Sequence, residues 1–555
     1  MTKRMDRRDF VASSLATAAA ATVGAMTTLV PINTAHAAEL DRDGALPDVF
    51  PYAELSVAEL QSRMAKGTLT SRTLTAAYLA RIAAVDRSGP TLNSVIETNP
   101  DALTIAAERD AERRAGKVRG PLHGIPVLIK DNIDSADRMQ TTAGSLALVG
   151  KPAPRDAFIV QCLRDAGAVL LGKTNLSEWA NFRSTRSTSG WSGRGGQTRH
   201  PFVLDRNPCG SSSGTGTAIS ANLAAVGIGT ETDGSIICPS SICGLVGIKP
   251  TVGLWSRSGI IPISSSQDTA GPMTRTVSDA AALLGALTGV DSRDRATVDS
   301  AGKSATDYTT FLDAKSLQGA RIGVARNMAG FHPTTDAAFE RAIESLRRAG
   351  AVIVDPANVP TVGKYDAAEL DVLLYEFKAG VNAYLAERGN TVSVRTMDDV
   401  IAFNRANAGA EMPYFGQEQM ERAQAMGSLD DAKYRDAVAT CRRLSRDEGI
   451  DAIMAQHSLD AIVAPSNGPS WPTDVINGDR YSGGNASVAA VAGYPSITVP
   501  MGFVDALPLG VSFIGRAWSE GRLIGLAYAF EQATKARRAP RFLTTMTIAV
   551  PKRGS

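Results

Sequence analysis

The sequence predicts a large α/β fold in which helices alternate with short strands. Continuous apolar runs such as GIPVLI (124–129), AVLLG (168–172) and AIVAP (461–465) have the length and composition of strands that are buried on both faces. Helix-like stretches lie between such runs, and this alternation is typical of layered α/β domains. Apolar residues make up 44% of the 555 residues, which is ample for a large buried core.

The first helices are indicated by their caps. Ser56 and Glu59 form a capping box that predicts a short helix. Apolar residues at helical spacing predict a second helix after Thr70. The charged stretch 101–115 predicts a third helix, which ends at Gly116.

Later elements continue the alternation. The stretch 217–229 predicts a helix that runs into a strand, and the apolar spacing around Ile343 predicts a helix before a strand at 351–354. From about 365 to 460 the pattern changes to long helical segments with few strand candidates, which predicts a mainly helical excursion on the same domain. The last expected elements are strands at 496–502 and 510–515 and a helix at 521–534.

Residues 1–37 resemble an export signal. Positive residues precede a weakly apolar stretch and an Ala-His-Ala cleavage site at 35–37. The Arg7-Arg8 pair resembles a twin-arginine signal, which exports folded proteins. A membrane anchor is the alternative, but four Ser and Thr residues interrupt the apolar run. We therefore expect cleavage after residue 37 and a periplasmic or secreted protein.

The mature chain, residues 38–555, is predicted to be a single domain, because no repeat, low-complexity tract or Pro/Gly/Ser-rich linker divides it. Removal of residues 1–37 takes away four positive and two negative charges, so the formal charge falls from +2 to zero. This balance, without a zinc-finger or RNA-binding signature, argues against a nucleic-acid partner. No other segment is apolar enough to span a membrane, so we expect no stable membrane association. The oligomeric state has no sequence signal.

Five cysteines remain in the mature chain, at positions 162, 209, 238, 243 and 441. An odd number in an exported protein predicts at least one free thiol. Cys238 and Cys243 have neither CxxC spacing nor a nearby histidine, so we interpret them as buried small apolar residues rather than a metal or redox site. We expect no metal and no organic cofactor.

Two short motifs match known patterns but lack the setting that their chemistry requires. Residues 167–174 fit the phosphate-loop pattern G-x4-G-K-[ST], yet their middle residues AVLL predict a strand rather than a loop. Residues 210–214 fit the nucleophile elbow of α/β-hydrolases, with Ser212 as nucleophile. That fold needs a late histidine, and the only candidate, His457, is followed by nearly 100 residues. A serine esterase or protease of this type stays the alternative mechanism.

A third set of residues combines three separate segments. PLHGIPVLIKDNID contains Lys130, CGSSSGTG contains Ser211 and GTETDGSIICPS contains Ser235. With the two serines 24 positions apart, this pattern resembles the amidase signature family, and the resemblance extends over nearly the whole mature chain. It implies the amidase-signature fold, a large mixed central β-sheet covered by α-helices on both faces.

The resemblance implies a Ser-Ser-Lys triad in which Ser235 is the nucleophile, Ser211 transfers protons and Lys130 is the base. A neutral lysine amine can act as a base once desolvation lowers its pKa from about 10.4 towards neutrality. Lys130 ends a buried apolar run, which is consistent with this role. Asp131 would oppose the change if it were close, but successive strand side chains point to opposite faces. Ser235 would attack an amide carbonyl and form an acyl-enzyme that water hydrolyses.

The resemblance also implies an oxyanion hole and a cis peptide bond that enters Ser211. The expected oxyanion donors are the backbone N–H groups of Thr232, Asp233, Gly234 and Ser235. The sequence departs from the commonest family pattern at Glu231, where Asp is usual, at Asp233, where Gly is usual, and at Cys209 before the serine loop. If the side chain of Asp233 faced inward, its charge would be unfavourable beside an oxyanion.

Within the family, four segments most closely resemble bacterial peptide amidases. They are GKTNLSEWANFRS, SGWSGRGGQTR, ETDGSIICPS and GIIPISSSQDTAGPM. Peptide amidases release ammonia from C-terminal peptide carboxamides, so the resemblance implies a peptide amide as substrate. The alternative is a broad-specificity amidase that acts on small aliphatic or aryl amides. A binding protein with an inactive site is disfavoured, because all three triad residues are present.

Overall fold

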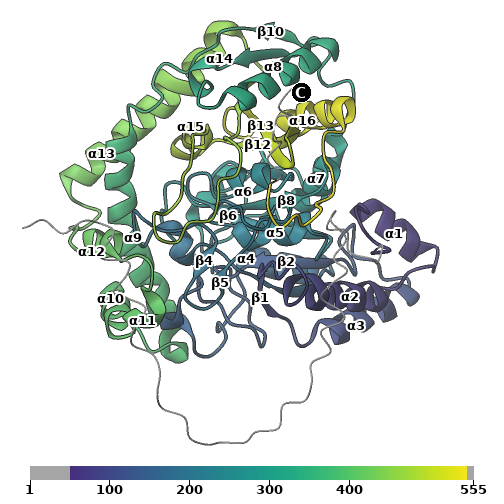
Figure 1. Ribbon diagram of the computed structural model, residues 1–555, viewed down its shortest axis with the longest axis vertical. Coiled ribbons are helices and arrows are strands. Elements are labelled where there is room, and N and C mark those ends of the chain that lie inside the picture. The colour runs from purple at the N-terminus through teal and green to yellow at the C-terminus, as the bar shows by residue number, and fades with distance from the viewer. Residues whose placement is uncertain (1–49, 547–555) are drawn as a thin grey trace, which may run out of the picture. The chain divides into compact units, whose positions relative to one another are not determined.

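The computed structural model describes residues 50–546, which belong to one compact unit built around a large β-sheet (Figure 1). The predicted export signal lies outside the described residues, and the domain boundary at residue 38 stays a prediction. The sheet has eleven strands in the order β1-β3-β2-β6-β8-β7-β12-β13-β11-β9-β10. Their bounds are β1 Val95–Thr98, β2 Pro126–Lys130, β3 Val169–Thr174, β6 Val226–Glu231, β7 Val246–Lys249, β8 Thr269–Thr274, β9 Arg321–Val324, β10 Val352–Val354, β11 Ala461–Pro465, β12 Ser496–Val504 and β13 Leu507–Ile514. A separate small hairpin pairs β4 Trp191–Ser192 with β5 Gly196–Gln197.

The large sheet is mixed. β2 pairs in parallel with β3 and β6, and β9 pairs in parallel with β10 and β11. The other neighbouring strands are antiparallel. Every residue of β2, β3, β6 and β11 is buried, as expected for apolar strands that are covered on both faces.

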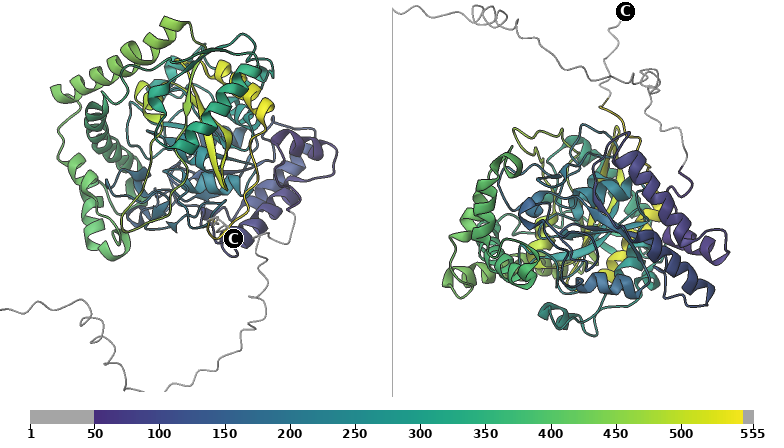
Figure 2. Two further views of the ribbon diagram at one scale, coloured as in Figure 1. Left: turned by 45° about the horizontal axis from the view of Figure 1, so that its top comes forward. Right: turned by 90° about the horizontal axis from the view of Figure 1, so that it is seen from below.

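Helices cover both faces of the sheet (Figures 1 and 2). α5 and α6 contact each other and the central strands, whereas α7 and α8 both contact α16 and pack with it on the sheet. The predicted α/β fold, a large mixed sheet between helices, is confirmed. The helices are α1 Val57–Ala65, α2 Ser71–Arg81, α3 Ala102–Arg114, α4 Phe158–Asp165, α5 Ser213–Ser220, α6 Ile237–Ile242, α7 Val277–Ala286, α8 Pro333–Arg348, α9 Asp366–Arg388, α10 Met397–Ala406, α11 Ala408–Glu411, α12 Glu418–Gln424, α13 Ala432–Arg442, α14 Asp451–His457, α15 Ala486–Ala492 and α16 Glu520–Thr534.

Most of the expected elements are present. The predicted strands at 124–129 and 168–172 correspond to β2 and β3, and the predicted helix and strand at 217–229 correspond to α5 and β6. The capping box of α1 is formed as expected. The sequence does not predict β8, because Gly271 and Pro272 lie in its middle and both residue types are rare in strands.

The segment 167–174, which fits the phosphate-loop pattern, forms part of the central sheet, as its apolar middle residues predicted. β3 takes up Val169–Thr174, so the pattern forms a strand rather than a loop. The Lys173 amine is buried and donates hydrogen bonds to the Ile133 carbonyl and, over 2.9 Å, to the Thr141 hydroxyl.

Between β10 and β11 the chain forms helices and no strand. These helices, α9 to α14, lie along one side of the unit (green in Figures 1 and 2). Apolar residues of α9, α10 and α12 form a second core with the segment that follows β3, where the rings of Phe377 and Trp179 are 6.4 Å apart. The helical segment is thereby attached to loops near the carboxyl end of β3. No helix within residues 50–546 is long and apolar enough to cross a bilayer.

The carboxyl ends of β2 and β6 lie next to each other in the middle of the sheet. Their parallel register pairs Ile129 with Ile228, so Lys130 at the end of β2 lies beside the last residues of β6. In open α/β sheets, ligands bind at the carboxyl ends of strands. This edge is therefore where the fold predicts a functional site.

Candidate active site

Lys130 and Ser211, two members of the predicted triad, are in direct contact. Lys130 Nζ lies 2.7 Å from Ser211 Oγ. The same nitrogen is 2.8 Å from Oγ1 and 3.3 Å from the carbonyl oxygen of Thr230, near the end of β6. The amine therefore has three hydrogen-bonding partners, and none of them carries a charge.

Lys130 is completely buried. Burial lowers the pKa of its amine from 10.5 to about 7, because desolvation penalises the ammonium form, whereas the charges of Asp268 and Glu231 act in the opposite direction. Asp131 points to the other face of the strand, where its carboxylate forms an ion pair with Arg194 at 3.4 Å. The predicted alternation of strand side chains thus separates Asp131 from the lysine amine.

The loop that carries Ser211 is tightly enclosed. Its Gly210–Ser211 peptide bond is cis, as the family resemblance implies. The Ser177 backbone N–H donates a 3.0 Å hydrogen bond to the Ser211 carbonyl oxygen. A Cβ atom at position 210 would lie 2.2 Å from the Ser177 hydroxyl oxygen, so any other residue would have to displace this hydroxyl.

Ser235 lies in the turn between β6 and α6. Gly234 has a φ of +78°, a conformation that glycine adopts without strain. The Glu231 carboxylate closes this turn, because it accepts hydrogen bonds from the N–H groups of Ile236 and Ile237 at 2.7 and 2.9 Å. Ser235 itself is 8% exposed. Its position between buried groups and solvent suits a hydroxyl that must meet a substrate.

A disulfide bond joins the two serine loops, so our interpretation of Cys238 as an unpaired apolar residue was wrong. Cys238 is bonded to Cys209, with Cα atoms 6.1 Å apart. Cys209 precedes Ser211 by two positions, and Cys238 follows Ser235 by three. Pairing depends on spatial distance, which cysteines 29 positions apart do not reveal. The prediction of at least one free thiol is confirmed by Cys162, Cys243 and Cys441.

The expected oxyanion donors surround Ser235. Within residues 50–546, the backbone N–H groups of Thr232, Asp233 and Ser235 donate no hydrogen bond, whereas that of Gly234 is directed at the Glu231 carboxylate. Free N–H groups beside a nucleophile are the donors that a developing oxyanion needs. Their role as an oxyanion hole stays a prediction.

The unusual Asp233 directs its side chain towards α15. The Ser487 hydroxyl donates a 2.6 Å hydrogen bond to its carboxylate. Glu369 on α9 lies nearby and accepts a 2.9 Å hydrogen bond from Gln267. Burial raises the pKa of both carboxyl groups, and the charge of Asp233 raises that of Glu369 further. At position 233, where glycine is usual in the family, this chain therefore has a carboxyl group that interacts with Glu369 beside the serine turn.

The α/β-hydrolase alternative is contradicted by the positions of its residues. The Ser212 hydroxyl donates to the Thr230 carbonyl and accepts from the Thr230 N–H, at 3.0 and 3.2 Å, so it is held by β6. The His457 carbonyl accepts a hydrogen bond from Arg321 on β9. Five strands lie between β6 and β9, a separation of about 29 Å at ~4.8 Å per strand. Ser212 and His457 therefore cannot form a catalytic pair.

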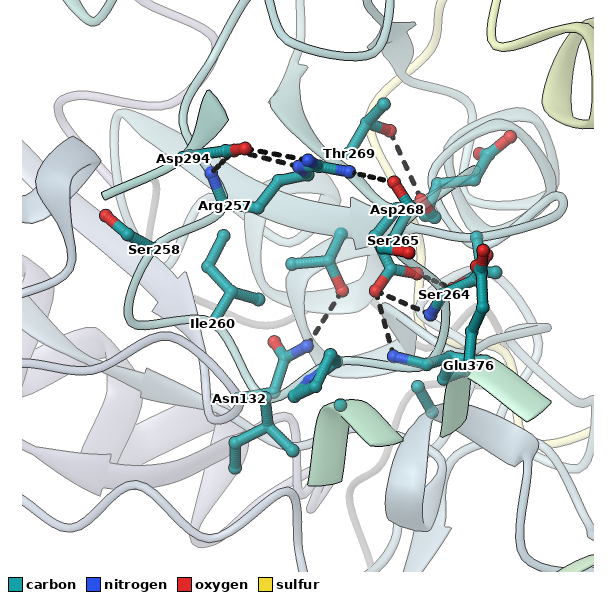
Figure 3. A pocket seen from close by; sticks show the side chains of 18 of the residues that line it. Asn132, Arg257, Ser258, Ile260, Ser264, Ser265, Asp268, Thr269, Asp294 and Glu376 are labelled. Carbon is teal, nitrogen blue, oxygen red and sulfur yellow. Dashed lines mark hydrogen bonds and ion pairs between the residues drawn. The ribbon is translucent and has the colours of Figure 1, made fainter. Parts of the chain in front are cut away.

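A cavity of about 360 Å³ adjoins the serine turn (Figure 3). Residues 260–263 and Leu429 contribute an apolar wall. Polar and charged groups contribute much of the rest, including the Arg257–Asp294 ion pair, in which nitrogen and oxygen are 2.7 Å apart. Asn132 and residues 230–232 line the cavity, and Thr230 also accepts a hydrogen bond from Lys130, so the cavity adjoins the predicted triad although no triad residue lines it.

Sequence reasoning missed three residues of this site. Thr230 accepts from Lys130, and Asn132 donates to the same Thr230 hydroxyl oxygen over 3.0 Å. Asp268 accepts a 2.6 Å hydrogen bond from the Thr232 hydroxyl. All three lie in segments that resemble the family. No sequence motif identifies a residue whose role is to form hydrogen bonds with a catalytic residue or with its loop.

Comparison with known proteins agrees with this geometry. The Amidase family model matches residues 73–524. A protein described as a probable amidase from Arabidopsis thaliana is 42% identical over 512 residues, which cover 90% of this chain and 93% of the relative. The chain therefore belongs to the amidase signature family, and it is an amidase.

Solved structures place it near one branch of that family. The peptide amidase from Stenotrophomonas maltophilia is 56% identical, with a TM-score of 0.85 over 89% of this chain and 100% of that chain. A structure of the peptide amidase PAM with the competitive inhibitor chymostatin is also 56% identical, with a TM-score of 0.86 over 88% of this chain and 99% of that chain. The resemblance to bacterial peptide amidases is thus confirmed.

Proposed function

We propose that the protein hydrolyses C-terminal peptide amides to a carboxylic acid and ammonia through a Ser235 acyl-enzyme. One observation carries the mechanism: a fully buried Lys130 amine, with a pKa of about 7, lies 2.7 Å from Ser211 Oγ. A buried lysine without a paired carboxylate is a poor structural cation and a suitable base.

The hydrogen bonds of Lys130 suit its neutral form. A neutral amine has two N–H bonds and one lone pair, and the two Thr230 oxygens accept the N–H bonds. The lone pair of the neutral amine then faces the Ser211 hydroxyl, 2.7 Å away. Ser211 can therefore donate a hydrogen bond to Nζ and transfer its proton along this bond during the reaction. Ser211 in turn takes the proton of Ser235 as that oxygen attacks the amide carbon.

The proton taken up by the Ser211–Lys130 pair is released again in the later steps. When the tetrahedral intermediate collapses, the C–N bond breaks and Ser211 passes a proton to the leaving nitrogen, which departs as ammonia. Water then attacks the acyl-enzyme, gives a proton to the Ser211–Lys130 pair and releases the acid and the Ser235 hydroxyl. The free N–H groups of Thr232, Asp233 and Ser235 stabilise the oxyanion in both steps.

The peptide-amide substrate rests on two supports. The solved relatives at 56% identity are named peptide amidases, and one of them binds chymostatin. The cavity beside the serine turn has an apolar wall and is large enough, at about 360 Å³, for a side chain of the acyl residue. A site that is wide on the acyl side and closed beyond the leaving nitrogen accepts NH2 and rejects a continuing chain.

Export through the twin-arginine route is the second part of the proposal. It rests on the Arg7-Arg8 pair and on the Ala-His-Ala site at 35–37. The Cys209–Cys238 disulfide supports it, because such bonds persist in oxidising compartments such as the periplasm.

The nucleophile can be identified by covalent labelling. A fluorophosphonate should modify Ser235, and Ser235→Ala should lose the label and about 10⁴-fold or more of kcat. Ser212→Ala is the matched control and should still be labelled at Ser235. Recovery of the adduct on Ser212, by peptide mass spectrometry, would contradict the proposed triad.

The base can be identified from the pH dependence of kcat/KM. Activity should rise as pH increases through about 7, because only the neutral Lys130 amine accepts a proton. Lys130→Ala and Lys130→Arg should each lose about 10²- to 10⁴-fold of activity, since arginine stays protonated. Thermal melting shows whether the variants fold. A histidine-to-alanine variant that folds but is inactive would argue against this mechanism.

The substrate class can be tested by ammonia release. We expect peptide amides to be hydrolysed with a kcat/KM at least about tenfold above that of acetamide-like amides and anilides. Internal peptide bonds should stay intact in the same peptides. Efficient turnover of small amides with none of peptide amides would instead favour the broad-specificity amidase, and rapid internal cleavage would indicate a protease.

Export can be tested with tagged full-length protein in a host that has a twin-arginine system. The mature N-terminus should be Ala38, and Arg7→Lys combined with Arg8→Lys should block export. Arg4→Lys, outside the pair, is the control and should be exported. Uncleaved protein that stays in the cytoplasm with its native signal would disprove this part.

A further inference from the structure

We propose that Asp268 is a positioning residue that connects the two halves of the active site: its carboxylate holds the loop of expected oxyanion donors in place, and its negative charge, without direct contact, favours the protonated form of the buried Lys130. The proposal rests on the function proposed above for Lys130 and for the N–H groups of Thr232, Asp233 and Ser235. Neither the family resemblance nor the triad assigns Asp268 a role.

Strand pairing brings Asp268 to the loop. β6 and β8 are antiparallel, with Glu231 opposite Thr269. The next residues in this register are Thr232, which leaves β6 towards Ser235, and Asp268, which enters β8. Asp268 is therefore opposite the first residue of the turn that carries the proposed nucleophile.

Three donors fix the Asp268 carboxylate in this place. The Thr232 hydroxyl donates to one oxygen over 2.6 Å. The backbone N–H groups of Ile263 and Ser264 donate to the other oxygen over 2.8 and 2.9 Å. Hydrogen bonds to a charged acceptor are stronger than neutral ones, so the carboxylate ties the Thr232 loop to the wall of the cavity. This holds the Thr232 N–H close to Ser235.

The same carboxylate acts on the base. After burial, Asp268 has the largest effect on Lys130, and its negative charge favours the protonated amine. Glu231 acts in the same direction more weakly, while its own carboxylate holds the turn and faces Lys249 on β7. Burial raises the pKa of Asp268 itself to about 6, while the hydrogen bonds from Thr232, Ser264 and Ile263 favour its ionised form.

Other charged groups surround this pair. Those that face Lys130 or Asp268 are Glu231 on β6, Arg257 before β8, and, around Arg257, Asp294 after α7 and Glu376 on α9. Arg257 is bonded through Nε and a terminal nitrogen to Asp294, and its positive charge also acts to lower the pKa of Asp268. Asp268 is thus the carboxylate whose removal should change both the loop and the base.

Three variants separate the two effects when the pH dependence of kcat/KM is measured. Asp268→Asn removes the charge, Asp268→Glu keeps the charge but displaces the hydrogen bonds, and Thr232→Val removes only the hydroxyl donor. All three should lower kcat by about 10- to 100-fold, because the oxyanion loop is loosened. Only Asp268→Asn should move the midpoint of the rise, to a pH about one unit lower, because the ammonium form loses its nearby negative charge.

Two results would overturn the proposal. One is an Asp268→Asn profile with the wild-type midpoint, and the other is Thr232→Val with wild-type kcat. If Asp268→Asn does not fold, the kcat of Thr232→Val still decides whether the contact matters. A wild-type enzyme whose activity does not rise near pH 7 would instead contradict the role of Lys130, and so the proposed mechanism rather than the role of Asp268 alone.

Discussion

The active site depends on one physical constraint, the burial of the Lys130 amine. Taking an ammonium group out of water without a paired anion is costly, so the group loses its proton near neutral pH. The fold achieves this by ending β2 between β3 and β6, where every strand residue is buried. The amine keeps only uncharged partners, from Ser211 and Thr230. Its neighbours are arranged so that a neutral nitrogen is satisfied and a charged one is disfavoured.

A second requirement is that two loops meet, although 24 positions separate their serines. α5 and β6 lie between these loops in the sequence and bring the chain back to the same edge of the sheet. The Cys209–Cys238 disulfide and a 3.2 Å hydrogen bond from the Ser212 N–H to the Ser235 carbonyl then join them. Ser212, which fits a nucleophile motif, serves this arrangement by bonding to β6. The adjacent serines Ser211 and Ser212 thus have different roles.

Much of the fold was predictable, because long apolar runs and caps report local structure directly. β2, β3 and β6 follow from their continuous apolar residues, and α1 follows from its capping box. β8 was not predictable, since its Gly271 and Pro272 are tolerated only because neighbouring strands hold it. Among the site residues, Lys130, Ser211 and Ser235 lie in specific motifs. Thr230, Asn132 and Asp268 form hydrogen bonds with Lys130, with each other or with the serine turn. Such contacts between neighbouring strands cannot be predicted from sequence spacing.

By itself, the sequence determined the family, the alternation of helices and strands and the residues proposed as the triad, because these depend on local pattern and on motif identity. Tertiary structure alone decided the environment that makes them chemically useful. The pKa of Lys130 depends on burial and on the charges of Asp268, which precedes β8, and of Glu231, the last residue of β6. The pairing of Cys209 with Cys238, and the turning of Asp233 towards Ser487, likewise depend on distances that only the folded chain sets. Desolvation and Coulomb interactions act through space, so the chain has to fold before either can act on the amine.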